Sequence, residues 1–119
     1  MIMKELQDLL AQFAQERDWE QFHTPKNLAM ALAGEAGELL EIFQWLAPDE
    51  SQAIMQTPER AQAVEEEMAD VFSYLLRLAD VLDIDLAQAL IDKVDKNGNR
   101  YPVHLSRGHA RKYTQLGDA

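Results

Sequence analysis

The sequence contains no cysteine. This absence excludes disulfides, thiolate zinc sites, iron–sulfur clusters and cysteine nucleophiles. Long apolar runs are also missing, because no stretch approaches the ~20 residues that a membrane-spanning helix needs. The first residues, MIMKELQDLL, show no signal-peptide pattern. We therefore expect a cytoplasmic protein without a membrane partner.

Basic residues are scarce, with 11 Lys and Arg against 21 Asp and Glu, and the formal net charge is −10. Such a charge disfavours binding to a nucleic-acid polymer, whose phosphates require a basic face. Between Glu35 and Asp70 the only basic residue is Arg60, whereas basic residues dominate from Lys93 onward. An acidic centre and a basic C-terminal part would suit a polyphosphate bound through a cation. A solvated acidic surface with a loose basic tail is the simpler alternative.

Apolar residues recur at three- and four-residue steps, and no strand pattern or internal repeat is present. The pattern predicts an all-α fold. We expect helices over about 4–19, 25–46, 58–82 and 86–97, with a helical turn in the connector 48–57 and an extended basic tail from about residue 99.

Helix-end signals support these boundaries. The expected N-caps are Thr24, Thr57 and Asp85. Asp85 is expected to form a capping box with Gln88. Asn97-Gly98 is expected to end the last long helix.

A chain of 119 residues is expected to form a single domain, 1–119, built as a bundle of four main helices. The helix predicted over 58–82 is long and apolar on more than one face. One subunit would leave part of that surface exposed, so we expect a homo-oligomer built on paired helices.

The segment 28–46 has an apolar helical stripe that is interrupted by Glu35, and Glu38 follows one turn later. The same spacing recurs in the helix over 58–82, where Glu67 precedes Asp70 by three residues. Four inward carboxylates on two helices are too costly to bury without partners. The pattern therefore predicts a cation site between the two helices.

Two glycines, Gly34 and Gly37, flank Glu35, although glycine costs about 1 kcal/mol inside a helix. They suggest that another group approaches the backbone closely at this point. Oxygen-only ligation favours Mg²⁺, with Mn²⁺ as a substitute. A di-iron site would require Glu-x-x-His on two helices. The one such spacing, from Glu20 to His23, lies in a linker. A structural alternative is that Glu35 and Glu38 are partly exposed and pair with basic residues of a neighbouring subunit.

Other candidate residues have weaker signals. Trp19 and Trp45, near helix ends, could stack on a planar base, although tryptophans at such positions are often part of the core. The same two interpretations apply to His23 and Tyr74. The last long helix ends with three polar residues spaced at i, i+4 and i+7, namely Lys93, Asn97 and Arg100. They could line a phosphate or sugar site, or they could simply complement the helix dipole.

The sequence G-E-x-G-E-L at 34–39, followed by E-E-x-x-D-V at 66–71, resembles the E-x-x-E…E-x-x-D signature of the MazG-like all-α nucleoside triphosphate pyrophosphohydrolases. The segments RDWEQFHTPKNL and RYPVHLSRGHARKYTQL resemble the dCTP pyrophosphatase branch of this family. The resemblance extends from about Glu5 to Leu116. It implies a helical fold assembled as a homotetramer, a dimer of dimers. It also implies Mg²⁺-dependent hydrolysis of (deoxy)nucleoside triphosphates, most of all dCTP or modified dCTP, to the monophosphate and pyrophosphate, in nucleotide-pool sanitation.

The resemblance also implies roles for individual residues. The metal ligands would be Glu35, Glu38, Glu67 and Asp70. A water would be activated by the metal or by a carboxylate, Glu38 or Glu41. The nucleotide contacts would be Trp19, His23, Trp45, Tyr74, Lys93, Asn97, Arg100 and Tyr101. Relatives in this branch can carry a histidine near the base where this chain has Leu10, which leaves the strength of a cytosine preference open.

A non-catalytic helical module that senses nucleotides or binds proteins would show the same apolar stripes. The presence of all four carboxylates favours the enzyme.

Overall fold

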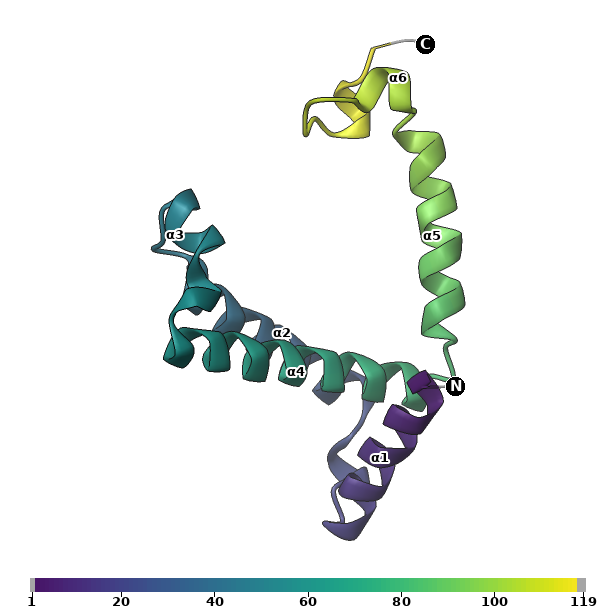
Figure 1. Ribbon diagram of the computed structural model, residues 1–119. Coiled ribbons are helices and arrows are strands. Elements are labelled where there is room, and N and C mark those ends of the chain that lie inside the picture. Colours follow the sequence, from purple (N-terminus) through teal and green to yellow (C-terminus); the bar gives the residue numbers. More distant parts are fainter. Residues whose placement is uncertain (1, 118–119) are drawn as a thin grey trace. The chain divides into compact units, whose positions relative to one another are not determined.

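The computed structural model describes residues 2–117, which form helices and no strands (Figure 1). The elements in chain order are α1 (Ile2–Glu16), η1 (Glu20–Phe22), α2 (Pro25–Phe43), α3 (Pro48–Gln52), η2 (Ile54–Gln56), α4 (Pro58–Val81), α5 (Leu86–Arg100), α6 (Val103–Ser106) and η3 (Tyr113–Gln115). The all-α prediction is therefore confirmed. The chain divides into two compact units, the first ending at Ile84 and the second beginning at Asp85.

Two of the three predicted N-caps make the expected hydrogen bond. Thr24 accepts from the N–H of Asn27 at 3.3 Å, with Pro25 as the first residue of α2. Asp85 accepts from the N–H of Gln88 at 3.0 Å. The Gln88 side chain, however, donates to Asp92 at 2.9 Å instead of accepting from the Asp85 backbone, so half of the predicted capping box forms. Thr57 precedes α4 without a side-chain cap within the described chain.

Several predicted helix ends are wrong by a few residues. α1 ends at Glu16 because Asp18 adopts a positive φ of 55°, and the N–H of Trp19 then bonds back to Ala14 at 2.9 Å. α2 ends at Phe43 and not near residue 46. α5 continues through Gly98, which has no positive φ, so the predicted stop at Asn97-Gly98 is wrong.

The predicted extended tail is also corrected. The region after α5 contains the short helices α6 and η3, and its backbone turns at Gly108, where φ is 84°. In the connector 48–57, the expected helical turn is confirmed as α3 and η2.

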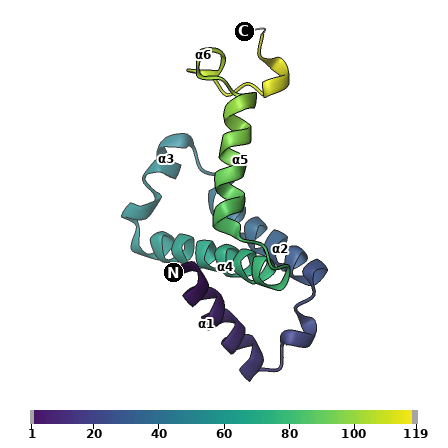
Figure 2. The same ribbon diagram turned by 90° about the vertical axis from the view of Figure 1, so that its right-hand side faces the viewer.

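The first unit is organised around α2 and α4, which lie side by side (Figure 1 and Figure 2). The predicted apolar stripe of α2 is the packed face, because every one of its members, from Leu28 to Leu46, is buried or partly buried. α1 packs on α4, where the Gln7 side chain donates to the carbonyl of Leu76 at 3.2 Å. The buried residues of the described chain, each less than a tenth exposed, are Ala14, Leu28, Ile54, Val64, Leu76 and Ala79. Three long helices thus share one unit, while the packing of α5 into a four-helix bundle stays a prediction.

Apolar side chains remain exposed in both units. Leu9 and Phe13 are exposed on α1, and Met68 and Phe72 are exposed on α4. In the second unit the exposed apolar residues of α5 are Leu90, Ile91 and Val94. Within residues 2–117 no helix is both long and apolar enough to span a membrane.

Candidate active site

The central feature of the first unit is a carboxylate cluster between α2 and α4. Glu35, Glu38 and Glu67 each offer an oxygen atom, and these atoms all lie within 4.8 Å of one another. Glu35 and Glu67 are partly buried, whereas Glu38 is exposed. Asp70 is exposed one turn beyond Glu67 and is not a member of this group. The expectation of four inward-facing carboxylates is therefore wrong in part, since none of them is fully buried within residues 2–117.

The proximity of like charges shifts the protonation of the cluster. The hydrogen bond with the Glu38 carboxyl, followed by burial, raises the pKa of Glu35 to about 7. Burial raises the pKa of Glu67, and the negative charge of Asp70 acts in the same direction on both residues. One oxygen of Glu35 and one of Glu67, Oε2 in each case, are buried without a hydrogen-bond partner among the described residues.

These observations test whether the residues fit a divalent cation. The donor set is entirely oxygen, which suits a hard cation such as Mg²⁺. A cation would also satisfy the two buried carboxylate oxygens and offset the negative charge gathered in this partly buried cluster. The residues therefore fit the expected metal.

The two glycines beside Glu35 have no packing explanation within the chain. No described atom outside the helix lies within 4 Å of a Cβ built on Gly34 or Gly37. The expected close approach to the α2 backbone is therefore not made by residues 2–117.

A groove of about 420 Å³ extends from the cluster along α2 and α4. Glu38 and Glu67 line it together with Glu41, Ile42 and Ala63. The structure thus places Glu41, one turn after Glu38, in the same groove as two of the predicted metal ligands.

A second cavity, of about 290 Å³, is lined in part by Glu35 and combines acidic, aromatic and basic walls. Glu35 and Asp70 line it, and so do Trp19, His23 and Tyr74, three of the predicted nucleotide contacts. We call it the aromatic pocket. Two of the four carboxylates, Glu35 and Asp70, therefore share one cavity with candidate base-binding residues.

The aromatic wall of this pocket comes from α1 and the residues that follow it. Phe13 and Trp19 meet edge to face, with ring centroids 5.8 Å apart at an interplanar angle of 67°. The Arg17 guanidinium lies over the Phe13 ring, 3.6 Å from its centroid. Trp19 remains 44% exposed, so part of its ring is free to contact a ligand. Leu10 also lines the pocket, in line with its expected place near the base.

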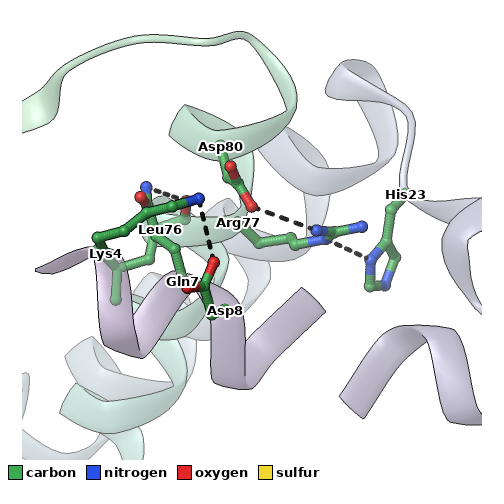
Figure 3. A network of polar contacts seen from close by, with 7 residues as sticks. All are labelled: Lys4, Gln7, Asp8, His23, Leu76, Arg77 and Asp80. Atoms are coloured by element: carbon green, nitrogen blue, oxygen red, sulfur yellow. Dashed lines mark hydrogen bonds and ion pairs between the residues drawn. The ribbon is translucent and has the colours of Figure 1, made fainter. Parts of the chain in front are cut away.

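The sequence analysis missed Arg77, which links the pocket to a polar network (Figure 3). Its Nε donates to Nδ1 of His23 at 3.1 Å, and its Nη1 lies 3.6 Å from Oδ2 of Asp80. Burial, followed by the charge of Arg77, lowers the pKa of His23. The signal was available in the sequence, because Arg77 follows Asp70 by seven residues and Tyr74 by three and so shares their face of α4.

Of the predicted nucleotide contacts in the first unit, Trp45 does not line this pocket. Trp45 is 87% exposed after the end of α2. Four other predicted contacts belong to the second unit: Lys93, Asn97, Arg100 and Tyr101. Two of them contact Tyr113. The Arg100 guanidinium lies 4.8 Å from the centroid of the Tyr113 ring, and the centroid of the Tyr101 ring lies 6.0 Å from it. Their part in nucleotide binding stays a prediction.

Comparison with known proteins finds similarity over most of the chain. The MazG-like family model matches residues 31–116. The chain is 52% identical over 114 residues to mouse dCTP pyrophosphatase 1 and 47% identical over the same length to the human protein, covering 96% of this chain and 67% of each relative. The crystal structure of a pyrophosphatase from Archaeoglobus fulgidus superposes with a TM-score of 0.80 at 46% identity, covering 86% of this chain and 94% of that one. These relatives confirm the predicted enzyme class, a pyrophosphohydrolase. The chain therefore belongs to the MazG-like family.

Proposed function

We propose that this protein hydrolyses a nucleoside triphosphate, dCTP or a modified dCTP, to the monophosphate and pyrophosphate with the help of Mg²⁺. The observation that carries the proposal is the carboxylate cluster of Glu35, Glu38 and Glu67, which adjoins an aromatic pocket. The relatives named dCTP pyrophosphatase 1 support the choice of base.

The four predicted ligands, Glu35, Glu38, Glu67 and Asp70, would hold Mg²⁺, with Mn²⁺ as a substitute. When bound, the cation would polarise the phosphate oxygens and neutralise charge on the leaving pyrophosphate. Glu38 and Glu41 line the groove beside the cluster, where either carboxylate can accept a proton from the attacking water. The water oxygen forms a new bond to phosphorus, the bond that bridges the α- and β-phosphates breaks, and the electron pair leaves with pyrophosphate.

The aromatic pocket would hold the base and sugar. Trp19 offers a partly exposed ring and Tyr74 a second aromatic wall, and His23 adds a polar group to the same pocket. Contacts with the aromatic faces provide dispersion and stacking energy of about 1–3 kcal/mol per base. Four polar side chains of the second unit would contact the phosphates or sugar: Lys93, Asn97, Arg100 and Tyr101.

The exposed apolar residues support a homo-oligomer, a tetramer built as a dimer of dimers. Met68 and Phe72 expose about half of their surfaces on α4, the same helix that carries Glu67. Association through this helix would cover them and rigidify the carboxylate cluster. Size-exclusion chromatography with light scattering should show a mass of several chains, and a monomer at micromolar concentration would contradict this part of the proposal.

Pyrophosphate release from a panel of dNTPs and NTPs, measured with Mg²⁺ and with EDTA, tests the function. We expect metal-dependent release that is fastest with dCTP or 5-methyl-dCTP. Glu38→Gln should lose this activity, whereas Glu65→Gln, an exposed carboxylate on α4, provides the matched control. Nucleotide binding without release from any substrate would instead support the sensing module.

A further inference from the structure

Resting on the proposed function, we infer that Arg77 is a specificity-determining residue, which together with His23 presents hydrogen-bond donors to the O2 and N3 acceptors of cytosine. The inference starts from the Asp80–Arg77–His23 network, in which Arg77 and His23 line the aromatic pocket (Figure 3).

The position of Arg77 along α4 places it beyond the phosphates. Asp70, Tyr74 and Arg77 follow one another on one face of the helix, and all three line the pocket. Seven residues separate Asp70 from Arg77, which corresponds to about 10 Å along the helix axis. A triphosphate held at the carboxylates would therefore direct its sugar past Tyr74 and its base toward Arg77. Trp19 lies in the same cavity and offers a surface for stacking.

The surroundings of Arg77 favour recognition by hydrogen bonds over capture of a phosphate. Its side chain is only 13% exposed, and Asp80 lies beside it and balances its charge. The planar guanidinium carries five N–H donors. Nε is used on His23 and Nη1 on Asp80, while Nη2 has no hydrogen-bond partner among residues 2–117. The group is thus fixed in orientation and retains free donors.

The same contact determines which nitrogen of His23 carries the proton. Because Arg77 Nε can only donate, Nδ1 of His23 must accept, and the neutral ring then carries its hydrogen on Nε2. Burial lowers the pKa of His23, which keeps the ring neutral near pH 7. Arg77 and His23 therefore both offer donors to the pocket.

This donor pair distinguishes among pyrimidines. Cytosine presents two adjacent acceptors, O2 and N3, and so accepts from two donors. Uracil and thymine have O2 but carry a hydrogen on N3, so one of the two protein donors would face the N3–H donor of the base. Mismatch of this kind in a desolvated site is strongly unfavourable, because a buried polar group loses its partner. The network offers a source of cytosine preference in a chain that has Leu10 at the pocket wall.

The test compares kcat/KM for three substrates with the full-length protein: dCTP, dUTP and the deoxynucleoside triphosphate of 2-pyrimidinone. The pyrimidinone base keeps O2 and N3 as acceptors but lacks the 4-amino group. Arg77→Met keeps the apolar stem and removes every donor. We expect it to lower kcat/KM for dCTP and the pyrimidinone substrate by about tenfold or more, mainly through KM, and to change dUTP by less than about threefold. Arg60→Met, on the exposed first turns of the same helix, should leave the dCTP to dUTP ratio unchanged.

Arg77→Lys keeps the charge and the stem but loses the planar donor geometry, so it should also lower the ratio of kcat/KM for dCTP to kcat/KM for dUTP. This variant replaces Arg77→Met in the test if Arg77→Met does not fold. Two outcomes overturn the inference: an unchanged ratio in a folded Arg77 variant, or an equal loss for all three substrates, which would indicate a phosphate contact or a structural role. Wild-type protein that releases no pyrophosphate from any of the three overturns the proposed function, and the inference with it.

Discussion

Glu35→Gln should stabilise the metal-free protein at the same time as it removes its activity. The substitution replaces a carboxylate by a neutral amide of nearly the same shape in the cluster with Glu38 and Glu67. The hydrogen bond with the Glu38 carboxyl, burial and, to a smaller extent, the neighbouring negative charges raise the pKa of Glu35, and in the metal-free protein a neutral amide avoids the cost of ionising this position. A residue that repels its neighbours without metal but is required with it has the properties expected of a ligand.

The magnitude follows from the pKa. A rise from 4.5 to about 7 corresponds to about 3 kcal/mol at full strength. Solvent reaches the cluster, since Glu38 is exposed, so screening should reduce the effect to about 1 kcal/mol. For a chain of this length that is about 4 °C in Tm.

The sign of the pH dependence is specific. Because the pKa of Glu35 is higher in the folded than in the unfolded chain, the wild-type protein should lose stability as pH rises from about 4.5 through about 7. Above that range the penalty is complete, and below it the carboxyl is protonated in both states. The advantage of Glu35→Gln should therefore be large at pH 8 and vanish near pH 4.5.

Thermal unfolding by circular dichroism at pH 5 and pH 8, with EDTA and with Mg²⁺, measures these effects. Mg²⁺ should raise the Tm of the wild-type protein at pH 8 more than that of Glu35→Gln, because the variant has lost a ligand. The control is Glu65→Gln, whose Tm should change little in either buffer. A Glu35→Gln protein that is less stable than wild type in EDTA at pH 8 would refute the electrostatic argument, and equal stabilisation of both by Mg²⁺ would refute the ligand assignment.

Further predictions concern other parts of the molecule. Glu38→Gln and Asp70→Asn should each lower kcat by about a hundredfold or more while circular dichroism shows an unchanged helical content, and near-normal turnover in either variant would remove that residue from the site. Leu76→Ala should lower the free energy of unfolding, measured in urea, by about 3 kcal/mol because Leu76 is 2% exposed. Leu90→Ala, at an exposed position, should lower it far less, and equal effects would contradict the assigned core. Trp45→Ala should raise KM and weaken the choice of base, and unchanged kinetics would place Trp45 outside the nucleotide site.

The limits of sequence-based prediction are visible at the helix ends. The stop expected at Asn97-Gly98 did not occur, because a glycine ends a helix only when it adopts a left-handed conformation, and Gly98 has no positive φ. α1 ended at Glu16, and the residue that turns the chain after it is Asp18, a non-glycine residue with a φ of 55°. Such local choices depend on what the following residues pack against, and that information is not contained in a short sequence window.

The sequence by itself determined the helical class, the packed face of α2 and the pairing of Glu35 with Glu38 and of Glu67 with Asp70. These follow from the period of the helix, which makes residues three or four positions apart neighbours regardless of the rest of the fold. Only the tertiary structure showed that Glu35, Glu38 and Glu67 form the tight cluster while Asp70 lies outside it. It also brought Arg77 to His23, 54 residues away in the chain. The distance between two helices, and the direction in which long side chains reach across them, depend on how α1, α2 and α4 pack.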